Sequence, residues 1–115
     1  MLKYKFQTKV IWEGQPARPL MKIQRPYQML EDLCNGHLGT LKGVEKTLSQ
    51  IEKVMEGNKK KISFGGSDAC IIDLSVKTSV ISYGFGEKEK EIATKEIIAL
   101  LKDWKKFLGS ILNIH

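Results

Sequence analysis

The chain has 115 residues, 42% of them apolar, which is the size and composition of one ordinary globular domain. No apolar run approaches the roughly 20 residues of a membrane-spanning helix, and the N-terminus lacks the continuous apolar segment of a signal peptide. We therefore predict one domain over residues 1–115, in a cytoplasmic protein with no membrane partner.

Positive charge dominates the sequence, with 19 Lys and Arg against 13 Asp and Glu and a net charge of +6. A basic chain attracts acidic proteins and nucleic acids over long range. Only Arg18 and Arg25 are arginines, although arginine is the residue best suited to bidentate contacts with phosphates and bases. The lysine bias therefore favours an acidic protein partner, and a nucleic acid is the alternative.

The N-terminal segment alternates between apolar and polar residues, which is typical of a strand with one buried face. The residues expected on the buried face are Leu2, Tyr4, Phe6, Thr8, Val10 and Trp12. The breakers Gly14, Pro16 and Pro19 follow, so residues 14–26 are predicted to form a loop with a short extended piece at 20–23.

Three helices are predicted from apolar stripes and their end signals. Pro26 suits the first turn of a short helix over 27–34, which Asn35 and Gly36 would end. A stripe at steps of three and four predicts a second helix over 38–56, with Gly57 as its stop. The clearest stripe predicts a helix over 95–112, with Thr94 as its cap; it consists of Ile97, Leu100, Leu101, Trp104, Leu108 and Ile111.

Short β-branched runs between the second and third helices predict strands. A turn is expected at 65–68 and a hairpin connection at 76–78. The expected strands are 61–64, 69–75, 79–84 and 89–93. This order predicts a single-domain α+β fold, in which a mainly antiparallel sheet contains the N-terminal strand and the strands within 61–93, with the helices packed on it.

Residues that could carry chemistry are few. Cys34 and His37 could form a nucleophile pair, and Asp68 and Asp73 could act as an acid–base or metal pair, but neither pair has a characteristic spacing. The cysteines Cys34 and Cys70 lack the spacing of a zinc or redox motif, and we expect both to be reduced thiols. We predict no catalytic, cofactor or metal site and no enzymatic activity; an enzyme that uses these four residues is the competing hypothesis.

Three lysine clusters are candidate binding residues. Lys3, Lys5 and Lys9 are expected on one face of the N-terminal strand, and Lys59 and Lys60 in the turn after the second helix. We predict that these five residues contact an acidic partner, with a solvated surface as the alternative. A third cluster lies on the last helix and comprises Lys102, Lys105 and Lys106.

The second half of the chain resembles small bacterial immunity proteins, which neutralise toxins delivered between competing cells. The likeness covers about 50 residues: the segment 67–74 (SDACIIDL), a turn, a second strand, and a helix that contains 100–108 (LLKDWKKFL). The resemblance implies a cytoplasmic, non-enzymatic protein that blocks a toxin domain by direct binding. Immunity proteins against nucleases are often acidic, whereas this chain is basic, so the expected partner is a toxin domain with an acidic surface.

Overall fold

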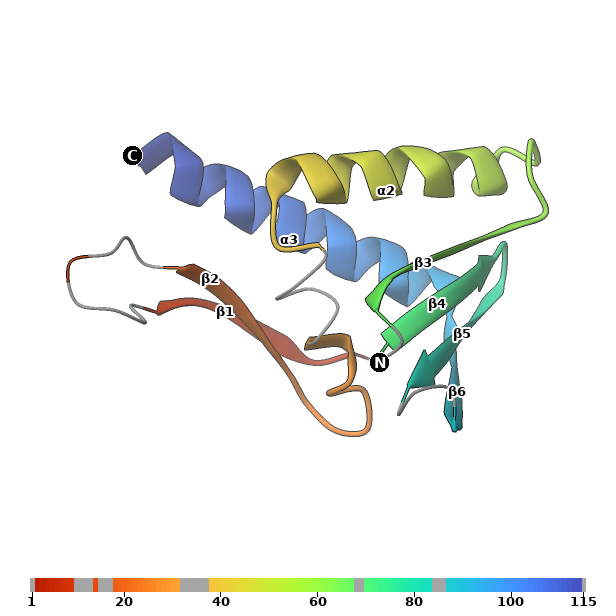
Figure 1. Cartoon of the computed structure of the whole chain (residues 1–115). Coiled ribbons are helices and arrows are strands. Elements are labelled where there is room, and N and C mark those ends of the chain that lie inside the picture. The colour runs from red at the N-terminus through yellow and green to blue at the C-terminus, as the bar shows by residue number, and fades with distance from the viewer. Residues whose placement is uncertain are drawn as a thin grey trace.

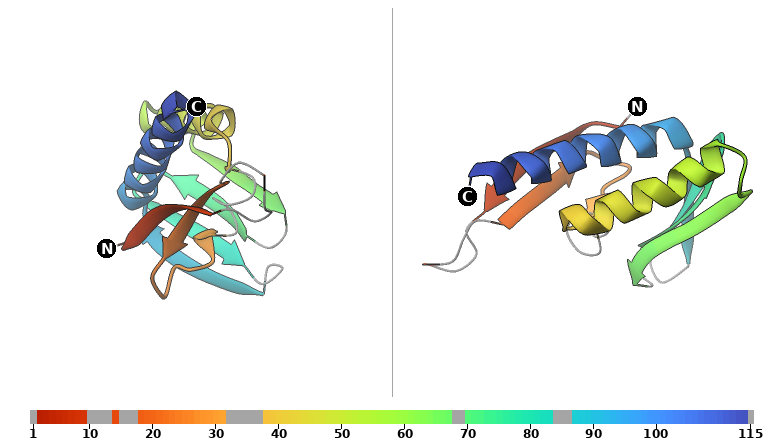
Figure 2. Two further views of the ribbon diagram at one scale, coloured as in Figure 1. Left: turned by 90° about the vertical axis from the view of Figure 1, so that its left-hand side faces the viewer. Right: turned by 90° about the horizontal axis from the view of Figure 1, so that it is seen from above.

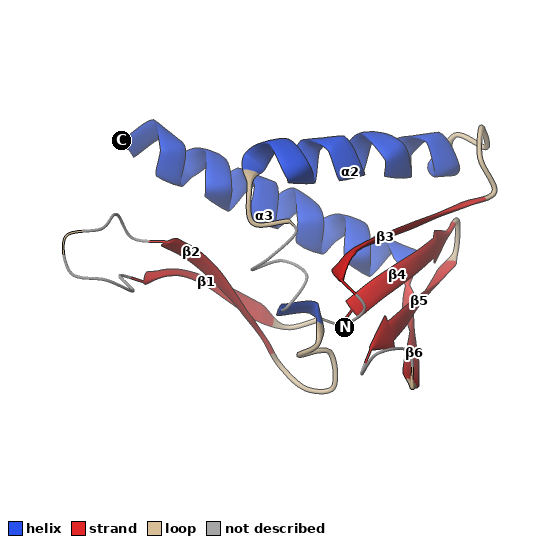
Figure 3. Cartoon of the chain, in the orientation of Figure 1, coloured by secondary structure: helices blue, strands red, loops and turns tan. Residues whose placement is uncertain are grey.

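A computed structural model describes residues 2–9, 14, 18–31, 38–67, 70–83 and 87–114 of the chain. These residues contain two helices of three turns or more and the strands that Figure 3 colours red. In chain order the elements are β1 (Tyr4–Lys9), β2 (Arg18–Ile23), α2 (Leu41–Met55), β3 (Lys61–Ser67), β4 (Cys70–Ser75), β5 (Thr78–Tyr83), β6 (Lys88–Ala93) and α3 (Thr94–Ile114). The predicted α+β class is confirmed.

Two antiparallel sheets make up the β structure, and they are separate (Figure 1). One is the β1–β2 hairpin, and the other has the strand order β3-β4-β5-β6. The N-terminal strand therefore does not join the strands of 61–93. The extended piece predicted at 20–23 lies within β2, and the loop predicted before it is wrong at 18 and 19, where β2 begins. Pro19 lies in β2 opposite Thr8. A two-stranded sheet consists of edge strands, where a proline is tolerated because its missing N–H need not face a partner.

The four-stranded sheet follows the predicted strands closely. Its side chains alternate between a helix-covered face and an open face; on β4, Cys70, Ile72 and Leu74 are buried and the residues between them are half-buried. The turn predicted at 65–68 is wrong, because β3 continues as far as Ser67. The strand passes through a register irregularity between Gly65 and Ser67. A β-bulge of this kind bends the end of the strand.

Helix α2 confirms the helix predicted over 38–56. Thr40 is its N-cap, with Oγ1 accepting a hydrogen bond of 3.1 Å from the Gly43 amide. Gly57 ends the helix at a positive φ of 85°, a conformation that glycine adopts without a steric penalty.

Helix α3 confirms the helix predicted over 95–112, and it begins directly where β6 ends. The Thr94 hydroxyl, predicted as a cap, bonds to the sheet instead: it donates to the Ser75 carbonyl at 2.6 Å. Since a hydroxyl carries one proton, Ser79 must then donate to Thr94 Oγ1, 2.7 Å away. Both side chains are fully buried, so this pair ties the start of α3 to the β4–β5 turn.

The segment predicted as a helix over 27–34 is described only as far as Glu31. Leu30 and Glu31 donate to the carbonyls three residues earlier, which is tight helical turn geometry. Pro26 lies in the turn before it, after a cis peptide bond, and not in a helical first turn. Residues 32–37, with Cys34 and His37, lie outside the described residues.

The core lies between the helices and one face of the four-stranded sheet, and the hairpin extends it along α3 (Figure 2). Trp104 is fully buried, and its Nε1 donates to the Leu38 carbonyl at 2.7 Å. From the hairpin, Phe6 packs its ring against both Trp104 and Phe107, with centroid distances of 5.4 and 5.2 Å. Helix α3 therefore joins the two sheets into one structure. None of the described helices has the length and apolar character needed to cross a bilayer.

Candidate partner-binding surface

The β1–β2 hairpin has one face on α3 and one face in solvent. Tyr4 and Phe6 point toward the core, so strand alternation places Lys3 and Lys5 on the open face, where both are exposed. Lys22 of β2 stands directly opposite Lys5 in the register and is also exposed. We call Lys3, Lys5 and Lys22 the cationic hairpin face.

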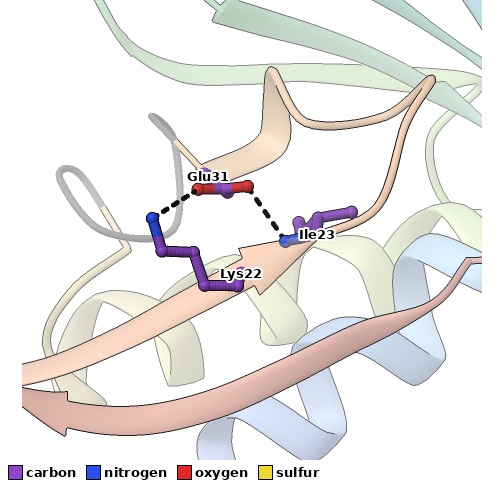
Figure 4. A network of polar contacts seen from close by, with 3 residues as sticks. All are labelled: Lys22, Ile23 and Glu31. Carbon is purple, nitrogen blue, oxygen red and sulfur yellow. Dashed lines mark hydrogen bonds and ion pairs between the residues drawn. The ribbon is translucent and has the colours of Figure 1, made fainter.

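Among the described residues that line this face, one is a carboxylate. Glu31 reaches Lys22 with an Oε1–Nζ distance of 3.8 Å, and its Oε2 accepts a hydrogen bond of 3.0 Å from the Ile23 amide (Figure 4). The three lysines and Glu31 line a shallow cleft of about 330 Å³. One carboxylate offsets one of the three positive charges, so the cleft keeps a net positive charge.

Sequence reasoning missed Lys22 as a binding residue because the extended piece predicted at 20–23 had no predicted strand partner. The signal that could have placed it is the apolar–polar–apolar order of Met21, Lys22 and Ile23, which puts Met21 and Ile23 in the core and Lys22 in solvent. Pro19, close to this short run, masked the start of the strand.

The other predicted lysines do not all join this face. Lys9 stands opposite Arg18 in the hairpin register, and the side chains of both lie outside the described residues. Lys59 and Lys60 are exposed in the connection between α2 and β3, at the end of α2 remote from the hairpin (Figure 1). The structure therefore brings Lys3 and Lys5 together and separates Lys59 and Lys60 from them.

Of the four candidate catalytic residues, the structure describes only Asp73. Asp73 accepts a hydrogen bond from the Ser63 hydroxyl on the neighbouring strand, a cross-strand pair on the open sheet face. Cys70 is buried in the core, and Asp68 lies outside the described residues with Cys34 and His37. Among the residues that the structure describes, no group of three or more His, Cys, Asp or Glu side chains could hold a metal ion.

Tyr4 connects the hairpin to α3 through a polar contact. Its hydroxyl donates to Asp103 Oδ2. Burial of the phenol raises the pKa of Tyr4 to about 12, and the hydrogen bond to Asp103 and the charge of that carboxylate act in the same direction. Ionising Tyr4 would therefore weaken the attachment of the hairpin.

This pKa predicts how stability changes at high pH. The folded state holds the Tyr4 proton more tightly than the unfolded state, where the pKa is near 10.0, so this contribution is complete below pH 10 and is lost as pH rises toward 12. We expect the free energy of unfolding to fall more steeply over that window in the wild type than in Tyr4→Phe. Urea titrations at pH 9, 10 and 11 measure both slopes, and equal slopes would contradict the prediction.

Comparisons of the chain with protein-family models, with curated proteins and with solved structures find no match. The candidate surface therefore rests on the residues and geometry described above.

Proposed function

We propose that the chain is a non-enzymatic binding protein that neutralises a bacterial toxin domain by direct contact, and that the cationic hairpin face is its docking surface. The observation that carries the proposal is the pairing of like charges across the hairpin. Lys5 stands opposite Lys22, and Lys9 opposite Arg18, in a register of six pairs. Like charges directly opposite each other on neighbouring strands destabilise a sheet.

Folding does not require these charges, because the register is fixed by the other face of the hairpin. Met21 and Ile23 are buried, and Tyr4 and Phe6 pack against the core. A neutral polar residue at Lys5 or Lys22 would leave that packing unchanged and remove the repulsion. An acidic partner surface supplies negative charge opposite these like-charge pairs, beyond that of Glu31.

The toxin-neutralising form of this proposal is supported by the resemblance of the second half of the chain to immunity proteins. Long-range attraction between the lysines and an acidic toxin surface would also speed the encounter. Rapid binding suits an inhibitor that must act before its target does.

Reversing the charge of the hairpin face tests the proposal. We expect Lys5→Glu/Lys22→Glu to weaken partner binding at least roughly tenfold, because the substituted carboxylates would face an acidic surface. The tagged chain is used as bait in an extract of its native host, and the partner it captures, including any product of the neighbouring gene, is purified for titration. Protection of growth is measured by co-expressing that partner with each variant.

The matched control is Lys77→Glu/Lys88→Glu, which changes the net charge equally at exposed lysines of the four-stranded sheet and its turn. This control should bind and protect like the wild type. Recovery of no protein partner, or equal binding by both variants, would contradict the proposal. Binding of labelled DNA or RNA at about 50 mM salt that Lys5→Glu/Lys22→Glu abolishes would assign the face to a nucleic acid instead.

A further inference from the structure

A groove runs between α2 and α3 on the side of the helices away from the four-stranded sheet. Its volume is about 810 Å³, and its lining comes from these two helices alone. In the view from above, no described element lies over the two helices (Figure 2). The groove is thus separate from the cationic hairpin face.

The floor of the groove is apolar along its length. Leu41, Leu48 and Met55 follow one another at intervals of seven residues on α2, and Ile98 adds to the floor from α3. Met55 is 45% exposed, and Leu41 and Leu48 are half-buried. A continuous apolar strip that reaches solvent is typical of an interaction surface.

The two walls of the groove carry opposite charges. Glu45 and Glu52 line it from α2, and Lys102, Lys105 and Lys106 line it from α3. All five side chains are exposed, and no ion pair joins the two walls in the part of the chain that the structure describes. The charges are therefore available to a molecule that lies in the groove.

We propose that this groove is the contact surface of a homodimer in which α2 of one copy lies on α3 of the other. The chain runs in opposite directions along the two helices (Figure 1). A two-fold axis along the groove places the acidic wall of each copy over the basic wall of its partner, twice in the same interface. It also brings the apolar strips of the two copies together.

The charges select this arrangement over its alternative. A two-fold axis across the groove would place α2 on α2 and α3 on α3, so that Glu45 and Glu52 would face carboxylates and the lysines would face lysines. Juxtaposed like charges repel each other and disfavour an interface. A foreign helix would need an apolar stripe with basic residues on one flank and acidic residues on the other, whereas a second copy already carries that pattern.

Charge reversal of each wall tests the dimer, by sedimentation equilibrium of the full chain between about 1 and about 100 µM. The wild type should be dimeric in this range. Glu45→Lys/Glu52→Lys and Lys102→Glu/Lys105→Glu should each raise the dimer dissociation constant at least roughly tenfold, because both contacts become repulsive. A mixture of the two variants, and a chain that carries all four substitutions, should dimerise like the wild type.

Two control variants test whether a loss of the dimer comes from the groove and not from a change in net charge or from the cationic hairpin face. Glu87→Lys/Glu89→Lys has the same net charge as the α2 reversal, at exposed residues in and before β6, and should remain dimeric. Lys5→Glu/Lys22→Glu should also remain dimeric, so a failed dimer and a failed partner contact are distinguishable. A wild type that is monomeric throughout the concentration range overturns the proposal, and the groove would then be the binding site of a different protein. A dimer that neither wall reversal weakens also overturns it.

Discussion

Replacing Trp104 by alanine is expected to lower the free energy of unfolding by about 3–5 kcal/mol, the largest effect of any single substitution considered for this chain. Trp104 is fully buried where three parts of the structure meet. Its ring centroid lies 5.4 Å from that of Phe6 in the hairpin and 5.8 Å from that of Phe107 in α3. Its Nε1 donates a hydrogen bond to the Leu38 carbonyl. The substitution leaves a cavity and removes the hydrogen bond at once.

Urea unfolding followed by far-UV circular dichroism measures this loss. Since domains of this size have total stabilities of about 5–15 kcal/mol, the variant should unfold at a much lower urea concentration. Trp104→Phe is the matched control: it keeps an aromatic ring but leaves the Leu38 carbonyl without its donor, and we expect a cost of about 1–3 kcal/mol. A cost below about 1 kcal/mol for Trp104→Ala would show that the hairpin and helices do not depend on this ring.

The elements that sequence periodicity could predict are those with a strong pattern along one stretch of chain. The stripe of α3 from Ile97 to Leu108 is buried as expected, and the described bounds of β4 and β5 lie within one residue of the predicted ones. The spacing of apolar residues follows from which side of a helix or strand faces the core. Burial alone therefore makes these elements predictable from the sequence.

Pairing between strands could not be predicted in the same way, because alternation identifies a strand without identifying its neighbour. The sequence predicts β1 in the main sheet, but β1 pairs instead with β2, of which only the short extended piece at 20–23 is predicted. The candidate site inherits this error. Lys5 was named from β1, but Lys22 joins it only through the hairpin register, and Lys59 and Lys60 form a cluster in the sequence that lies elsewhere in space.

The bulge in β3 could not be predicted either, because two adjacent glycines are more often a turn than a strand. Gly65 pairs with Ile71, so β3 and β4 approach closely at this point. A Cβ atom at Gly65 would lie 2.5 Å from the Cys70 carbonyl oxygen and 3.0 Å from the Ile71 Cα. Glycine is thus required by the distance between two backbones, which the sequence does not display.

Gly65→Ala is therefore expected to lower the free energy of unfolding by about 1–3 kcal/mol, the usual cost of forcing an extra carbon into packed structure. The added methyl group meets backbone atoms of β4, which cannot rotate away as a flexible side chain could, so β3 must shift from its register. Gly109→Ala is the matched control. Apart from its chain neighbours and the backbone of α3 itself, no atom lies within 4 Å of a Cβ at Gly109, and the substitution should stabilise the helix by about 0.5–1 kcal/mol. Urea unfolding measures both changes, and a Gly65→Ala variant as stable as the wild type would mean that β3 and β4 are not in the close register that places Gly65 opposite Ile71.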